Sequence, residues 1–144
     1  MKIELLRIAI DFGLMVLIWM VQLLIYPSFR HFASDGLGKW HKIYSGNMTV
    51  VVAPMMFTQV YLAYHYWTNL QDMYVINITY TILVALTWLT TFLFFIPIHA
   101  AIDKTPTNQM LIKKLINYNW MRVLLWSTIV AIDICFFTRY FGKH

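Results

Sequence analysis

Four long apolar segments dominate this chain of 144 residues, at about 4–26, 48–67, 73–98 and 119–139. An α-helix rises 1.5 Å per residue, so about 20 residues cross the roughly 30 Å of hydrocarbon in a bilayer. Each segment is long enough to do so. The sequence therefore predicts an all-α integral membrane protein, a four-transmembrane-helix bundle in which residues 1–144 form a single membrane domain.

The composition indicates lipid surroundings. Hydrophobic residues make up 60% of the chain and charged residues 12%, whereas soluble proteins carry about 25% charged residues. The net charge is +5, but the basic residues gather beside the apolar segments, where anionic lipid headgroups are a better counterpart than nucleic acid. We therefore expect the lipid bilayer, and no nucleic acid, as a partner. The single cysteine, Cys135, excludes an intramolecular disulfide.

The connections between the segments predict the topology. A tight turn is expected at about 70–72, and longer basic loops at 28–47 and 99–118. With four spans, both long loops lie on one side of the membrane and both termini on the other. The positive-inside rule favours cytoplasmic loops and external termini, and we expect a bacterial inner membrane.

The two halves of the chain share short features. Tyr26-Pro27 matches Ile96-Pro97, Trp19 lies near the equivalent of Trp88, and Asn47 and Asn119 open the following helices. Matches at a similar offset, here about 70 to 72 residues, are typical of a repeated unit. Two-span units in the same orientation are related by an axis along the membrane normal. We therefore predict an internal repeat of two tandem helical hairpins.

Polar side chains inside the spans are the candidate functional residues, because ionised groups in hydrocarbon are costly and face the bundle interior or water. Helical spacing places them on one face of each helix. The sequence predicts a cup near the long loops, with His99, Arg122 and Asn119 as candidate catalytic residues. The expected substrate-binding residues are Trp19, Gln22, Tyr26, His41, Tyr44, Trp88 and Trp126.

Two roles stay open for the charged members of the cup. His99 follows Pro97 and is expected to act as a general base or metal ligand, or to be an interfacial histidine bonded to a loop carbonyl. Arg122 is expected either to bind an anionic or carbonyl-bearing ligand or to extend to the headgroups. The tryptophans Trp19, Trp88 and Trp126 are expected either to surround a ligand or only to pack within the bundle.

A second polar layer is expected near the opposite surface, from Asp11, His65 and Asp133, together with Asn77. The aspartates either pair with an arginine about one turn away, Arg7 or Arg139, or transfer protons or bind metal.

The cofactor stays unknown at this stage. Two axial histidines for one heme are not apparent, because only His65 lies within a span, although single-histidine ligation is open. His31, His41 and His99 could form a metal cluster, but their spacing matches no standard motif. Heme and a metal ion are therefore both kept as possibilities.

Several short patches resemble a small four-helix membrane family that includes the anthrone-oxygenase-like proteins. They are Trp19-x2-Gln22-x3-Tyr26-Pro27-Ser28-Phe29, Trp40-His41-x2-Tyr44, Pro97-x-His99 and Asn119-Trp120-x-Arg122-x3-Trp126. The resemblance implies an oxygen-dependent oxidoreductase acting on polycyclic aromatic substrates. The residues at matching patches are Tyr26, His41, His99, Asn119, Arg122 and Trp126.

The expected function is thus a membrane-embedded oxidoreductase acting on a lipophilic, polycyclic aromatic or quinone-like small molecule held in an intrabundle pocket. One alternative is a small-molecule, ion or proton binding and transport protein, which would need a homo-oligomer because four helices form only a narrow path. A heme- or metal-binding membrane subunit is another. In a purely structural subunit, the polar side chains on the inner helix faces would only form hydrogen bonds between helices.

Overall fold

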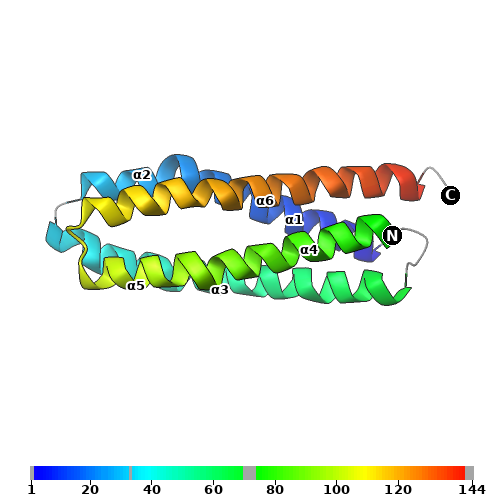
Figure 1. Ribbon diagram of the computed structural model, residues 1–144, viewed down its shortest axis with the longest axis horizontal. Helices are drawn as coiled ribbons and strands as arrows, with labels where there is room; N and C mark the ends of the chain where they lie inside the picture. The colour runs from blue at the N-terminus through cyan, green and yellow to red at the C-terminus, as the bar shows by residue number, and fades with distance from the viewer. Residues whose placement is uncertain (1, 33, 70–73, 142–144) are drawn as a thin grey trace.

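The computed structural model describes residues 2–32, 34–69 and 74–141, which are almost entirely helical. Its elements are α1 (Lys2–Met20), η1 (Val21–Ile25), α2 (Tyr26–Ser28), η2 (Phe29–His31), α3 (Ser34–Asn69), α4 (Tyr74–Thr90), η4 (Thr91–Phe95), α5 (Ile96–Lys104) and α6 (Gln109–Phe141). The elements α1 to η2 follow one another without a break, as do α4, η4 and α5. Long helical rods therefore make up almost all of the described fold (Figure 1).

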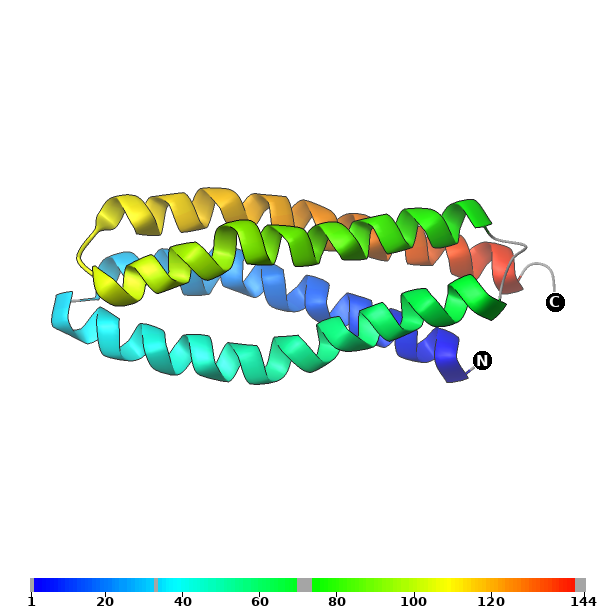
Figure 2. The same ribbon diagram turned by 60° about the horizontal axis from the view of Figure 1, so that its bottom comes forward.

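The rods lie side by side along one axis. Helix α1 packs against α3 and α6, and α4 packs against α3 and α6. The first residue of α1 and the last residue of α6 lie at one end, and the α2–α3 and α5–α6 connections lie at the other (Figures 1 and 2). We call these the terminal end and the loop end of the bundle.

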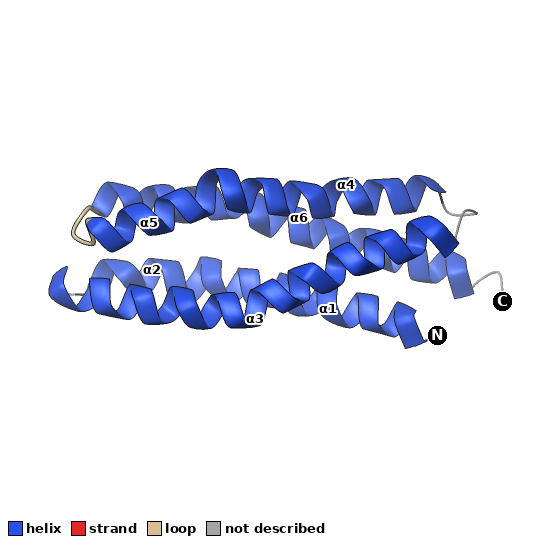
Figure 3. Cartoon of the chain, turned by 90° about the horizontal axis from the view of Figure 1, so that it is seen from below, coloured by secondary structure: helices blue, strands red, loops and turns tan. Residues whose placement is uncertain are grey.

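The prediction of long loops over 28–47 and 99–118 was wrong. Helix α3 already begins at Ser34 and α5 continues to Lys104, so the α5–α6 connection is a short turn before Gln109 (Figure 3). The polar and basic residues of these segments lie on helices instead. A helix of 36 residues, as α3 is, measures about 54 Å, which is longer than the hydrocarbon layer. The polarity that resembled loops therefore belongs to the ends of helices.

In the described part of the chain, three helical segments are long and apolar enough to cross a membrane: Ile3–His31, Tyr74–Lys104 and Gln109–Thr138. They contain the first predicted span and most of the third and fourth. Helix α3 contains the second predicted span, but it is not among these three. The chain thus has the character of an integral membrane protein.

Large apolar side chains cover much of the outer surface of the bundle. Val75 is 76% exposed, and Leu24, Phe92 and Leu124 are each more than half exposed. Soluble proteins rarely expose such surfaces over a wide area, because contact of apolar groups with water is unfavourable. Lipid is the solvent that suits this surface.

Two π-helices interrupt the α-helical rods. The Tyr26 N–H donates to the Val21 carbonyl and the Ile96 N–H donates to the Thr91 carbonyl, each across five residues. Each π-helix ends two residues before a proline, which has no N–H to donate and whose ring clashes with the carbonyl four residues earlier. The wider turn changes the direction of the side chains that follow it.

Candidate active site

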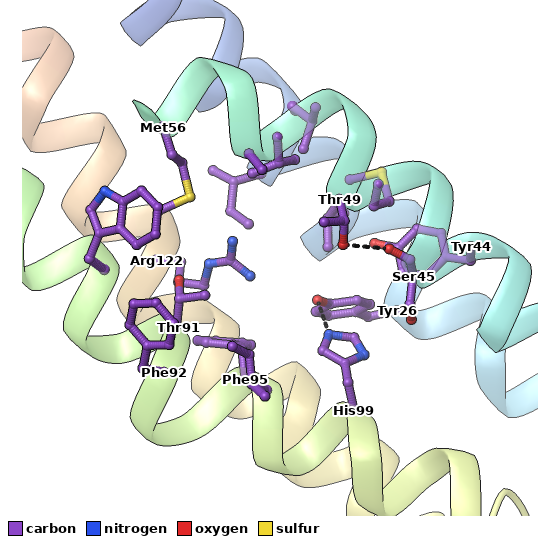
Figure 4. A pocket seen from close by; sticks show the side chains of 18 residues that line it. Tyr26, Tyr44, Ser45, Thr49, Met56, Thr91, Phe92, Phe95, His99 and Arg122 are labelled. Carbon is purple, nitrogen blue, oxygen red and sulfur yellow. Dashed lines mark hydrogen bonds between the residues drawn. The ribbon is translucent and has the colours of Figure 1, made fainter. Parts of the chain in front are cut away.

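A cavity of about 340 Å³ lies in the loop-end half of the bundle, between α3 and the α4–η4–α5 rod (Figure 4). Its walls are mostly apolar and include Met56, Trp88, Phe92 and Phe95. Its polar lining residues are Tyr26, Tyr44, Ser45, Thr49, Thr91, His99 and Arg122. An apolar cavity of this size with a few convergent polar groups is typical of small-molecule sites.

A chain of hydrogen bonds leads to this cavity. Asp103 Oδ1 lies 2.7 Å from His41 Nδ1, and His41 Nε2 lies 2.8 Å from His99 Nδ1. His99 Nε2 lies 3.2 Å from the Tyr26 hydroxyl. We call Asp103, His41, His99 and Tyr26 the relay cluster.

One set of proton positions satisfies every bond of the relay cluster. If the Asp103 carboxylate accepts from His41 Nδ1–H, then His41 Nε2 is free to accept from His99 Nδ1–H. His99 Nε2 then accepts from the Tyr26 O–H. These tautomers are assigned from the network of partners. Both imidazoles are neutral in this arrangement, which suits buried rings because burial disfavours charge.

The relay cluster connects the exterior with the cavity. The Asp103 side chain is 34% exposed, whereas that of His41 is fully buried. Tyr26 is buried at the other end, and both Tyr26 and His99 line the cavity. A proton can therefore be exchanged between the cavity and the outside without an open water channel.

Arg122 and Tyr44 line the cavity together with Tyr26, and the ring centroids of Tyr26 and Tyr44 lie 6.4 Å apart. The Arg122 guanidinium carbon lies 4.4 Å from the ring centroid of Phe95 and 5.1 Å from that of Trp126. Such contacts with ring faces stabilise a cation. Figure 4 shows the guanidinium directed into the cavity.

Asn119 and Gln22 form a buried pair rather than part of the cavity wall. Asn119 Nδ2 donates to Gln22 Oε1 at 2.9 Å, and neither residue lines the cavity. The bond joins α6 to η1, three residues from Arg122. The structure thus places Asn119, a predicted catalytic residue, in a helix-to-helix contact about one turn from Arg122.

The three predicted tryptophans occupy different places. Trp88 lines the cavity, and Trp126 is buried against the Arg122 guanidinium. Trp19 lies on the exterior, where its indole donates to Ser127 Oγ at 3.2 Å and packs edge-on against Trp120. The expectation that Trp19 shares a face with Tyr26 assumed a regular α-helix, and η1 between them breaks that periodicity.

Asp11 and Asp133 of the second predicted layer lie together in the terminal-end half of the bundle. Arg7 Nε donates to Asp133 Oδ1 at 2.7 Å. Gln59 Nε2 donates to Asp11 Oδ1 at 2.5 Å, and the Tyr80 hydroxyl approaches the same oxygen at 3.4 Å. We call these five buried residues the Arg7 cluster. It joins α1, α3, α4 and α6.

The predicted partners within this layer need correction. Arg7 pairs with Asp133 of another helix rather than with Asp11, and the side chain of Arg139 lies outside the described residues. His65 is not in the Arg7 cluster: it is half-buried, and its ring nitrogen faces Asn69 of the same helix. Spacing along one helix cannot reveal partners on the next helix, so the Arg7–Asp133 pair was missed.

Asn77 and the possible metal ligands also have definite places. The Asn77 amide donates to the Tyr66 carbonyl at 3.3 Å and so joins α4 to α3. Within residues 2–32, 34–69 and 74–141, no group of three or more histidine, cysteine or acidic residues is placed to hold a metal ion. His41 and His99 are instead bonded to each other, with stacked rings 5.0 Å apart.

Asp103 is the main functional residue that sequence reasoning missed. It lies four residues after His99, so both fall on one face of a helix. That spacing was a usable signal, but Asp103 lay in a segment interpreted as a loop. Phe95 of η4 was also missed, and it lines the cavity.

No protein-family model matches this chain, and neither the curated proteins nor the solved structures contain a match. The resemblance to anthrone-oxygenase-like proteins therefore stays an expectation based on short patches. Of the patch residues, Tyr26, His41, His99 and Arg122 meet at or beside the cavity.

Proposed function

We propose that this protein is a membrane-embedded oxidoreductase whose substrate is a lipophilic aromatic molecule, polycyclic or quinone-like, bearing a phenolic or carbonyl oxygen. One observation carries the proposal: a hydrogen-bonded chain from the half-exposed Asp103 ends at Tyr26, inside a cavity with apolar walls. Such a site can bind an uncharged aromatic substrate and remove a proton from that substrate.

Binding in this proposal uses both kinds of lining residue. Trp88, Phe92 and Phe95 offer aromatic surface to the rings of the substrate. The Arg122 guanidinium faces the substrate oxygen and stabilises the negative charge that develops on it. In a site that excludes water, a fixed positive group of this kind is worth far more than in solution.

The proton leaves through the relay cluster in this proposal. The Tyr26 oxygen takes a proton from the substrate while Tyr26 passes its own proton to His99 Nε2. His99 Nδ1–H then moves to His41 Nε2, and His41 Nδ1–H moves to the Asp103 carboxylate. Both histidines end neutral, in their other tautomers, so no buried imidazolium forms.

Oxidation follows on the anion with dioxygen as the oxidant, as the resemblance implies. A methylene flanked by aromatic rings becomes a carbonyl and receives one oxygen atom. The other oxygen atom leaves as water with the two hydrogens of the methylene. The role of the protein is to generate and hold the anion, which is the form that gives electrons to dioxygen.

The membrane arrangement belongs to the same proposal. We infer that α3 also crosses the bilayer, as the fourth span, because Val50, Val51 and Phe57 on its surface are at least half exposed. Phe92 and Ile96, both exposed, line the cavity beside α3, so a lipophilic substrate enters between α3 and η4. The π-helices before Pro27 and Pro97 support tandem hairpins. The basic loop end would lie in the cytoplasm.

A transport role has less support. Protons or ions would have to pass between the relay cluster and the Arg7 cluster. Buried apolar side chains lie between these clusters in the core, among them Leu14, Ile18 and Val84. A proton cannot cross such a layer without a polar carrier.

The test is dioxygen consumption by the purified protein in lipid nanodiscs, with anthrone as the substrate. We expect turnover to fall about 100-fold in His99→Gln and in Tyr26→Phe, since general-base catalysis contributes about that much or more. Trp19→Phe is the matched control, because Trp19 lies outside the cavity. Full turnover in the His99 and Tyr26 variants would refute the proposal, as would wild-type protein that neither binds nor oxidises aromatic substrates.

A further inference from the structure

A second cavity, of about 460 Å³, lies between α3 and α4, on the terminal-end side of the first. Helix α3 contributes Val60, Ala63 and Tyr64, and α4 contributes Thr81, Ala85 and Trp88. Its lining is almost entirely apolar. Small residues on both helices, Ala63 and Ala85, leave the space that larger side chains would fill. The function proposed above does not use this cavity.

The two cavities follow one another along the same pair of rods. Trp88 lines both of them. From His99 in the first cavity to Thr81 in the second, the rod advances 18 residues, which corresponds to about 27 Å. This length approaches the thickness of the hydrocarbon layer. The polar side chains that the proposed function uses, Tyr26, His99 and Arg122, line only the first of the two cavities.

We propose that the ligand is a single amphiphile: an oxygen-bearing aromatic ring in the first cavity, joined to a long apolar tail that lies in the second cavity. This inference rests on the proposed function and specifies its substrate class, an oxygen-bearing aromatic ring system that carries the reacting methylene and an alkyl or isoprenoid tail. Compact polycyclic substrates would leave the second cavity to bilayer lipid.

A covalent link between ring and tail gives a physical reason for this choice. The tail is equally soluble in the bilayer and in an apolar groove, so transfer from lipid contributes little by itself. Once the ring is held near Arg122, however, the attached tail reaches the groove at a high effective concentration and displaces a bilayer lipid chain. The groove therefore selects tailed rings over bare ones.

The experiment compares two probes on the full-length protein in nanodiscs: 2,3-dimethoxy-5-methyl-1,4-benzoquinone and the same ring with a decyl tail. Binding is measured by quenching of tryptophan fluorescence, and Trp88→Phe identifies the part of the signal that arises between the cavities. We expect Ala85→Leu to weaken binding of the decyl compound roughly tenfold, about 1.4 kcal/mol. Binding of the bare ring should not change.

Ala131→Leu is the matched control, since Ala131 is exposed on α6 and lines neither cavity. Partitioning of the probes into lipid is the same for both variants and cancels in the comparison. If Ala85→Leu leaves decyl binding unchanged while both probes bind, the tail inference is overturned and the proposed function stands. If neither probe binds to wild-type protein, the tail inference is overturned, and the proposed function is then decided separately by dioxygen consumption with anthrone.

Discussion

The relay cluster and the Arg7 cluster contain similar chemical groups in different settings. Each has aspartate and tyrosine side chains, and each has a buried arginine in or beside it. The relay cluster faces a cavity and reaches the exterior through Asp103. In the Arg7 cluster every side chain is enclosed by the bundle, and the Arg7 guanidinium carbon lies 3.8 Å from the centroid of the Tyr80 ring.

The difference teaches that enclosure, rather than residue type, separates a site from a structural contact. A buried ion pair that is enclosed by packed side chains leaves no room for a ligand. Removing one partner of such a pair leaves the other as an unpaired buried charge. A polar chain that ends at a cavity can meet a substrate. We therefore expect the effect of a mutation to be largest in the Arg7 cluster and smallest at Asn119, in the helix contact beside the cavity.

The largest effect is expected in the Arg7 cluster. Replacing Asp133 by Leu leaves the Arg7 cation buried without its carboxylate and should lower the free energy of unfolding by about 3 to 5 kcal/mol. The measurement is unfolding in mixed micelles with increasing SDS. The double variant Arg7→Met/Asp133→Leu should recover most of the loss, and a loss equal to the sum of the single changes would contradict the pairing.

The next effect is expected at Arg122. Replacing Arg122 by Gln keeps hydrogen-bonding capacity but removes the positive charge, and should reduce kcat about 100-fold, as loss of an anion-stabilising donor does in other enzymes. Steady-state dioxygen consumption and an SDS unfolding curve together check this. An unchanged kcat would show that no negative charge develops beside Arg122.

A smaller effect is expected at the outer end of the relay. Asp103→Asn still accepts from His41 Nδ1–H but cannot take up the proton, so turnover should fall about tenfold, the low end of a general acid–base contribution. Asp103→Glu should restore most of the activity. Equal turnover in wild type and Asp103→Asn would mean that the proton leaves by another route.

The smallest effect is expected at Asn119. Asn119→Ala removes one interhelical hydrogen bond and should cost about 0.6 to 1.7 kcal/mol of stability. The KM for substrate should change little, because Asn119 does not line the cavity. A large increase in KM with normal stability would return Asn119 to the role of a binding residue.

Much of the fold was predictable from local patterns. Long apolar segments predict helices, and the described chain is almost entirely helical, with three segments suited to spanning a membrane. His99 and Arg122 were predicted as cavity residues, and both line the cavity. The boundaries of the helices were less predictable, because polar helical ends have the same composition as loops.

By itself, the sequence determined that the chain forms long apolar helices, because hydropathy acts on the chain within one or two turns, but it did not determine where each helix begins and ends. Only the tertiary structure decided which side chains meet. The π-helix before Pro27 rotates Tyr26 away from the face of Trp19, and helix packing brings Asp133 to Arg7 and His41 to His99. These contacts depend on the rotation and depth of each rod relative to its neighbours, which spacing along a single helix does not encode.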